Sequence, residues 1–416
     1  MSSTSEPLSL AADPKFGREV KVITLVSIAH FTSHVHGMLL PPIFGLVKES
    51  FGVSYLQVGL AITAFNVCSA LLQTPAGFLV DRIGPRVMLT GGLAVGAVAI
   101  AAAALAPGYW FFIIAYALLG VANTVYHPAD YSILSAAIDP KRIGKAFSIH
   151  TFAGYLGFGV TPAMVLACAA LWDWHGAFLF ASGLSFSVAL LLIVFGSVLP
   201  RAAPRPPSKP TAAARSDAKV GFDLLLSGPI LRNLLFFFCL AMANGGVQTF
   251  SVVALGKIHG TPASVANIGL SAFLLLSAGG VLLGGIIADR TAHHERVAAI
   301  GFAFTSTMAL LMGWVNMPAA VLIFVMSFGG LLNGIIQPSR DMMVRAVTPV
   351  GSFGKVFGFV TTGLNLGGMV APLLYGFLMD QGQPRAIFMI VVAFIFLALA
   401  TAVTRAKPQA ANAWIR

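Results

Sequence analysis

The stretch NTVYHPAD at residues 123–130 returns 210 residues later as NGIIQPSR at residues 333–340. A second pair, GFLVDR at residues 77–82 and GIIADR at residues 285–290, repeats at the slightly shorter offset of 208. One half of the chain is therefore a copy of the other. Duplicated halves in a membrane protein commonly place a solute site at the interface between them, so the repeat itself favours a transport function.

Composition places this repeat in a membrane. Of the 416 residues, 57% are hydrophobic and only 9% are charged, with a mean hydropathy of +0.88, whereas soluble domains carry about a quarter charged residues. Helices are expected, because lipid offers no partner to unpaired backbone groups and about 20 helical residues cross the hydrocarbon core. We predict an all-α membrane protein with twelve transmembrane helices, near residues 22–46, 54–80, 87–106, 110–135, 147–171, 177–199, 230–255, 264–288, 297–316, 319–343, 356–379 and 386–404.

Positive charges predict the orientation. Of the 25 Lys and Arg residues, only Lys48, Lys257 and Arg385 fall in the odd-numbered turns between the predicted helices. Because Lys and Arg are enriched on the cytoplasmic side, we expect a multi-pass protein of the inner (plasma) membrane with both termini in the cytoplasm. The formal net charge of +11 is then a topology signal. Its cations are spread over separate segments, which argues against nucleic-acid binding.

A proline-rich stretch at residues 200–228 is the one linker of any length. Such sequence cannot pack a core and serves as a semi-rigid tether. It divides an N-terminal six-helix bundle at residues 1–199 from a C-terminal six-helix bundle at residues 229–416. An even number of helices before the linker keeps the halves parallel, so we expect two pseudo-symmetric bundles related by an axis along the membrane normal, in a monomer.

Polar side chains inside a membrane are costly, so they mark either structure or a pathway. Here they gather on the first, fourth, seventh and tenth predicted helices, at the spacing of single helix faces. We expect these helices to surround one polar cavity that binds substrate and protons. The candidate residues are His30, His34, Asn123, His127, Asp130, Asn244, Gln248, Asn333, Gln337 and Arg340. Each asparagine taken alone could equally make a structural bond between helices, with an average contribution of about 0.6 kcal/mol.

Asp130 and Arg340 occupy equivalent positions in the two halves and carry opposite charge. One hypothesis is that they pair across the interface when the cytoplasmic side closes, so that a substrate or proton at Asp130 biases the two states. The other is a structural pair of Asp130 with Arg86, while Arg340 is held by Asp341 or by a helix end. Both hypotheses stay open at this point.

The chemistry of these residues favours proton coupling and an anionic cargo. His34, His127 and Asp130 lie along one route, and histidine changes charge near neutral pH. The intramembrane cation Arg340 favours a small anionic or zwitterionic solute over a bulky cation. The chain shows no nucleophile–base pair, no paired carboxylates, no Cys/His ligand spacing and no phosphate loop. We therefore expect no enzyme activity, no cofactor and no metal.

The stretch GFLVDRIGPR at residues 77–86 resembles the signature of the major facilitator superfamily, and residues 285–290 resemble it more weakly. The resemblance covers essentially the whole chain. It implies an alternating-access carrier in which Asp81 and Arg82 help to lock the cytoplasmic side. The gating residues that it implies are Gly77, Asp81, Arg82, Gly84 and Arg86, with Gly285, Asp289 and Arg290 in the second copy.

Within this superfamily, His30, the LLQ of residues 71–73 and the pair His127-Pro128 resemble the fosmidomycin-resistance type of exporter. We therefore predict a secondary active transporter of a small organic solute that is coupled to protons and exports a drug-like or anionic metabolite. One alternative is a proton-coupled uptake symporter for an organic anion. An alternative of another class is a non-transporting membrane sensor, although a sensor normally adds a soluble domain that the 29-residue linker is too short to form.

Overall fold

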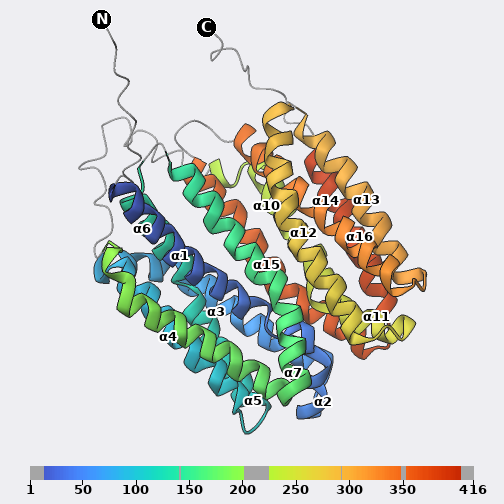
Figure 1. Cartoon of the computed structure of the whole chain (residues 1–416). Coiled ribbons are helices and arrows are strands. Elements are labelled where there is room, and N and C mark those ends of the chain that lie inside the picture. Colours follow the sequence, from blue (N-terminus) through green and yellow to red (C-terminus); the bar gives the residue numbers. More distant parts are fainter. Residues whose placement is uncertain (1–13, 140–141, 201–223, 292, 348–352, 404–416) are drawn as a thin grey trace, which may run out of the picture.

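The protein is described by a computed structural model that covers residues 14–139, 142–200, 224–291, 293–347 and 353–403. These residues form long helices arranged in two bundles (Figure 1). Large apolar side chains such as Phe111, Phe186 and Phe324 remain exposed on the outer surface. Exposure of this kind suits a lipid environment, in which the hydrophobic effect does not force such side chains inward.

The N-terminal bundle contains the first six predicted membrane helices. Its helices are α1 (Pro14–Met38), α2 (Phe44–Phe51), α3 (Tyr55–Ile83), α4 (Pro85–Ala104), α5 (Tyr109–Asn123), α6 (Tyr126–Ala137) and α7 (Ile143–Phe195). α7 comprises two membrane helices, because the backbone leaves helical geometry at Trp172 and Asp173. The Asp173 carboxylate then accepts the backbone N–H of His175 at 2.7 Å and so caps the second part.

The C-terminal bundle repeats this plan. Its elements are α10 (Gly228–Gly245), a π-helical turn η4 (Gly246–Phe250), α11 (Ser251–His259), α12 (Ala263–Arg290), α13 (His294–Trp314), α14 (Ala319–Ala346), α15 (Phe353–Asp380) and α16 (Pro384–Val403). The described residues contain eleven segments long and apolar enough to cross a membrane. With α7 counted twice, they correspond to the twelve predicted helices. Most of the predicted linker lies outside the described residues, so its boundaries stay a prediction.

The bundles meet where α3 packs against α15 and where α7 packs against α12. At the start of α3, both carboxylate oxygens of Asp380 accept backbone N–H groups, from Tyr55 at 2.7 Å and from Leu56 at 2.9 Å. A carboxylate is stabilising there, because unpaired N–H groups and a partial positive charge gather at a helix N-terminus. The helices also approach closely, since a Cβ on Gly59 would lie 2.7 Å from the carbonyl oxygen of Pro372.

Contact between the bundles continues along α3 as far as Asn66, whose side-chain amide donates to the carbonyl of Gly368 at 3.0 Å. Beyond Asn66, we find no hydrogen bond from α3 to the C-terminal bundle in the described part of the chain. Asp81 and Arg82, near the other end of α3, have exposed side chains. In this conformation the hydrogen bonds of α3 to the C-terminal bundle therefore lie in the half of α3 that begins with Tyr55.

The turn between α3 and α4 needs a glycine. Gly84 has a φ of 108°, which lies in the region that a side chain makes costly. Arg86 follows in the first turn of α4 and donates from Nη2 to the carbonyl of Ile193 at 3.2 Å, within its own bundle. This contact leaves Arg86 away from Asp130, so the alternative pair between those two residues does not form in this structure.

The remaining signature positions lie on α3 and α12. Gly77 and Gly285 have open space where a Cβ would lie. The side chain of Asp289 is outside the described residues, and Arg290 ends α12 with an exposed side chain. The gating role of all these residues stays a prediction.

Candidate functional site

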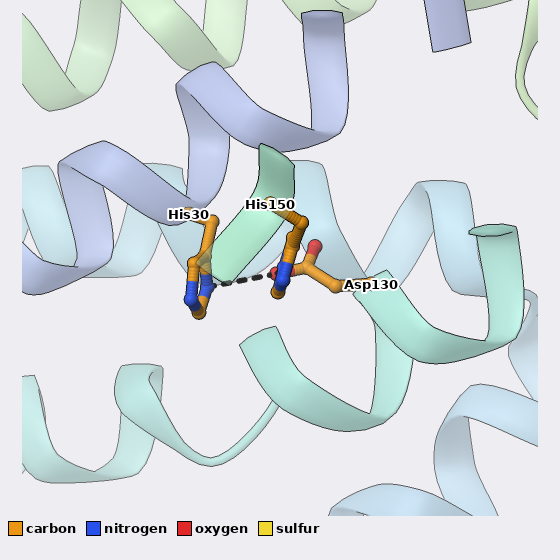
Figure 2. Close-up of side chains that lie close together, drawn as sticks. All are labelled: His30, Asp130 and His150. Atoms are coloured by element: carbon orange, nitrogen blue, oxygen red, sulfur yellow. Dashed lines mark hydrogen bonds and ion pairs between the residues drawn. The ribbon is translucent and has the colours of Figure 1, made fainter. Parts of the chain in front are cut away.

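Asp130 lies at the centre of a group of ionisable side chains inside the N-terminal bundle (Figure 2). Its side chain on α6 is 0% exposed, and its Oδ2 atom lies 3.2 Å from Nδ1 of His30 on α1 and 3.0 Å from Nε2 of His150 on α7. His30 and His150 are themselves only 3% and 1% exposed. Together with His34 and His127, these residues are called the histidine–aspartate cluster below.

The fourth membrane helix tightens locally just before this position. α5 ends at Asn123 and α6 begins at Tyr126, while Thr124 and Val125 between them keep right-handed helical dihedral angles. Pro128 stands in the first turn of α6, where a missing N–H leaves no helical hydrogen bond unmade. His127 and Asp130 follow one turn apart and therefore share a face of α6.

The imidazole rings of the cluster pack closely on one another. The rings of His30 and His150 are stacked with centroids 3.7 Å apart, and those of His34 and His127 lie 4.5 and 5.2 Å from His30. A Cβ on Gly154 would lie 2.8 Å from the Nε2 atoms of both His30 and His34. Glycine at this position of α7 therefore makes room for the rings.

Several polar atoms of the cluster are buried without a hydrogen-bond partner among the described residues. They are Oδ1 of Asp130 and the Nδ1 atoms of His30, His34, His127 and His150. Nδ1 of His30 lies 3.2 Å from Oδ2 of Asp130 but without the geometry of a hydrogen bond. Each such atom costs about 1–3 kcal/mol of stability, so the cluster is a poor choice for packing alone. A carboxylate oxygen with an imidazole on either side can accept, share and release a proton.

The cluster also has the composition of a transition-metal site. His30, Asp130 and His150 offer donor atoms within 4.8 Å of one another, and metals accept two imidazoles with a carboxylate. In this structure the Asp130 oxygen itself lies within contact distance of both rings. We interpret the cluster as a place for protons, because its carboxylate and its two imidazoles already contact one another.

His150 is the member that the sequence analysis missed. The signal was available, because His150 stands alone in an apolar run and precedes Gly154 by one helical turn. The ten candidate residues were chosen by their spacing on the first, fourth, seventh and tenth predicted helices. His150 lies in the first part of α7, which is the fifth predicted helix. Only the fold brings α7 against α1 and α6.

The predicted asparagines do not join this cluster. Asn123 donates from Nδ2 to Ser69 Oγ at 2.9 Å, within the N-terminal bundle. Asn244 and Asn333 line a cavity of about 50 Å³ among the helices of the C-terminal bundle, together with apolar residues such as Met308 and Met312.

Gln248 lies half-buried in the π-helical turn η4 that follows α10. Turns of this kind are frequent at functional sites, because the extra residue redirects the side chains of the helix. Among the predicted residues of α10 and η4, Gln248 is thus the one on a distorted backbone.

Gln337 and Arg340 lie on α14 at the interface between the bundles. Gln337 accepts a hydrogen bond from the hydroxyl of Tyr155 on α7, which is a contact between the two bundles. Arg340 donates from Nε to Asp341 Oδ1 at 2.9 Å, and its guanidinium lies over the ring of Phe237 at 4.7 Å. Tyr155 did not emerge from the sequence.

The structure therefore divides the predicted set instead of gathering it around one cavity. The histidines and Asp130 lie within the N-terminal bundle, Asn244 and Asn333 line a cavity in the C-terminal bundle, and Gln337 meets Tyr155 between them. The predicted pair of Asp130 with Arg340 does not form in this conformation, because their neighbours are His30 and His150 on one side and Asp341 on the other.

Comparison with known proteins agrees with this architecture. The Fosmidomycin resistance protein of Escherichia coli (strain K12) is 23% identical over 398 residues, which are 94% of each chain. The "Probable L-galactonate transporter" of the same organism is 22% identical and covers 84% of this chain and 83% of its own.

Among solved structures, a bacterial homologue of the human lysosomal transporter Spinster superposes with a TM-score of 0.79 at 15% identity, over 94% of this chain and 98% of that one. This likeness concerns the fold. The family model described as Major Facilitator Superfamily matches residues 26–294 and 234–414, which together span nearly the whole sequence. On the repeat, the two bundles and this match, the chain belongs to the major facilitator superfamily and is a secondary transporter, not an enzyme.

Proposed function

We propose that this transporter exports a small organic anion across the inner membrane and uses the proton gradient to do so. The single observation that carries the proposal is the contact of the fully buried Asp130 carboxylate with both His30 and His150. The predicted orientation, with both termini in the cytoplasm, belongs to the same proposal.

The argument for proton coupling is electrostatic. An ionised carboxylate inside a membrane protein is costly unless a partner neutralises it. Asp130, His30 and His150 come from three different helices, so the number of protons on the cluster changes the attraction that holds α6 between α1 and α7. A proton gradient can then bias the equilibrium between two arrangements of the bundle.

Two features support an organic anion as cargo. Arg340 supplies a permanent positive charge at the interface between the bundles. Two similar proteins carry fosmidomycin and L-galactonate in their names. Export is favoured over uptake by the likeness to a resistance protein, because removal of a toxic compound from the cell is the simplest route by which a carrier confers resistance.

Transport in proteoliposomes tests the coupling. The purified protein is reconstituted with a pH-sensitive dye inside the vesicles, and fosmidomycin and L-galactonate are offered under an imposed pH gradient. We expect proton movement that depends on one of these solutes and stops with Asp130→Asn, while His36→Gln, a buried histidine outside the cluster, behaves like the wild type. Solute flux that ignores both the gradient and an uncoupler would contradict proton coupling.

A strain that lacks the gene tests the direction. If the protein is an exporter, its loss sensitises cells to the transported compound, whereas loss of an uptake symporter makes cells more resistant or prevents growth on the solute. Labelling of single cysteines placed in the loops before Pro85 and after Ala104 reports the orientation. Labelling of the first loop from outside the cell would contradict the proposed topology.

A further inference from the structure

The interface between the bundles holds a second polar group, formed by side chains of both halves. Gln337 and Arg340 are three residues apart on α14 and therefore lie on the same face of that helix. Tyr155 reaches them from α7 and donates its hydroxyl hydrogen to Gln337 Oε1. Tyr155 is also close enough to Arg340 and Asp341 to interact with their charges.

Arg340 is held in a way that leaves its binding fork available. Its Nε atom donates to Asp341 and its guanidinium plane lies over the ring of Phe237, which is fully buried. The side chain is only 15% exposed. Within the described part of the chain, its two terminal amino groups have no hydrogen-bond partner.

A guanidinium held in this way suits one class of ligand. The two terminal amino groups can bind both oxygens of a carboxylate, phosphonate or sulfonate in parallel, and the fixed Nε contact reduces the entropy lost on binding. Asp341 offsets part of the positive charge, so an anion is held chiefly by its hydrogen bonds.

Tyr155 links the same ligand to the movement of the bundles. Its hydroxyl can donate only one hydrogen bond, which goes to Gln337 in the structure. An anion bound at the Arg340 fork competes for that hydrogen, and the side-chain amide of Gln337 can donate to the anion at the same time. The contact between bundles would then run through the ligand instead of directly from Tyr155 to Gln337.

We propose that Arg340, Gln337 and Tyr155 form the binding site for the anionic group of the transported solute, a carboxylate, phosphonate or sulfonate, and that the site is complete only when both bundles contribute. The inference rests on the proposed function as an organic-anion carrier. It adds the contacts that recognise the anion and introduces Tyr155 as a residue that determines specificity.

Equilibrium binding to the purified protein in detergent, without any gradient, tests this site. The probes are L-galactonate and a set of organic acids of two to six carbons that carry a carboxylate, sulfonate or phosphonate, each beside its uncharged ester or amide. We expect the acids to bind and their uncharged counterparts to bind at least about tenfold more weakly.

Three substitutions separate the contacts. Arg340→Lys keeps the charge but loses the fork, and we expect the affinity to fall at least about tenfold. Tyr155→Phe removes a single hydroxyl and should weaken binding about fivefold. Arg385→Lys and Tyr109→Phe are matched controls, because Arg385 bonds the Gly313 carbonyl and Tyr109 bonds the Gln57 carbonyl, each within one bundle. The controls should bind like the wild type.

The outcomes distinguish the site from the function. If acids bind the wild type but Arg340→Lys and Tyr155→Phe bind them equally well, the site is wrong while the anion carrier stands. If none of the acids binds the wild type, the proposed substrate class fails together with the site. Asp130→Asn should still bind the acids more tightly than their uncharged counterparts while losing proton-driven transport. Should Arg340→Lys fail to fold, Tyr155→Phe and the uncharged probes still decide the question.

Discussion

The two bundles share one sequence pattern but carry different chemistry at matching positions. Each member of the histidine–aspartate cluster has a counterpart 210 residues later that does not titrate near neutral pH. His30, His34, His127, Asp130 and His150 correspond to Leu240, Asn244, Gln337, Arg340 and Val360. A group that takes up and releases protons must be titratable, whereas a group that holds an anion at any pH is best permanently charged. The difference suggests a division of labour, with protons in the N-terminal bundle and cargo contacts in the C-terminal bundle.

The backbones differ only locally. The fourth membrane helix has a tight turn at Thr124 and Val125 between α5 and α6, while its counterpart α14 runs on as Ala319–Ala346. In both helices the polar pair is three residues apart on one face, as His127 with Asp130 and as Gln337 with Arg340. Duplication thus supplied two similar scaffolds, and different side chains at matching positions gave each its own polar group.

The largest effect is expected at the centre of the N-terminal cluster. Asp130→Asn removes the carboxylate that contacts both His30 and His150, and we expect proton-driven transport to fall about 100-fold, near the upper end of typical coupling free energies. The measurement is the initial rate of solute flux under a pH gradient. Anion binding at equilibrium is the control. If the variant transports as fast as the wild type, the proposed division of labour between a proton-binding and a cargo-binding bundle is wrong.

A smaller effect is expected when one residue of the N-terminal cluster is replaced by its counterpart in the C-terminal bundle. His150→Val installs the residue found at the equivalent position 360, and we expect transport to fall about tenfold, because Asp130 loses one of the two imidazoles that contact its Oδ2 atom and keeps the other, His30. The stability of the protein should also drop by about 1–3 kcal/mol, since the carboxylate loses a hydrogen-bond partner. His36→Gln serves as the control, and equal loss in both variants would point to packing alone.

Space for the rings gives the third prediction. Gly154→Ala places a methyl group against the Nε2 atoms of His30 and His34, and we expect the free energy of unfolding to decrease by about 1–3 kcal/mol. Thermal unfolding in detergent measures this change. Gly279→Ala is the matched control, because nothing lies within 4 Å of the added carbon there. Similar melting of both variants would mean that the cluster is looser than the structure describes.

The smallest effect concerns the contact between the bundles. Asp380 caps α3 from the C-terminal half, while the equivalent position 170 in the N-terminal half is an alanine that cannot do so. Asp380→Asn keeps one acceptor oxygen and loses the charge, and should weaken this contact by about 1 kcal/mol. Spin labels near the start of α3 and the end of α15 should then report a larger share of widely separated pairs. An unchanged distance distribution would show that the cap contributes nothing to closure at this end.

Much of the fold was predictable from local features. The repeat and the apolar runs indicated twelve helices in two bundles, and the structure confirms this with α7 covering the fifth and sixth. The polar spacing also singled out His30, His127 and Asp130, because ionisable residues are rare in apolar runs. His150 and Tyr155 escaped, since both lie on α7, at a spacing of five residues that does not match the helix-face pattern seen on the other four helices.

The sequence by itself determined the membrane environment, the duplication and the superfamily, because hydropathy, repeats and signature motifs are read along the chain without knowledge of contacts. Only the tertiary structure decided which polar groups meet. Asp130 and His150 are 20 residues apart, Tyr155 and Gln337 are 182 apart, and Leu56 and Asp380 are 324 apart. Hydrogen bonds act over about 3 Å, so these partners depend on how the helices pack, and no spacing along the chain encodes them.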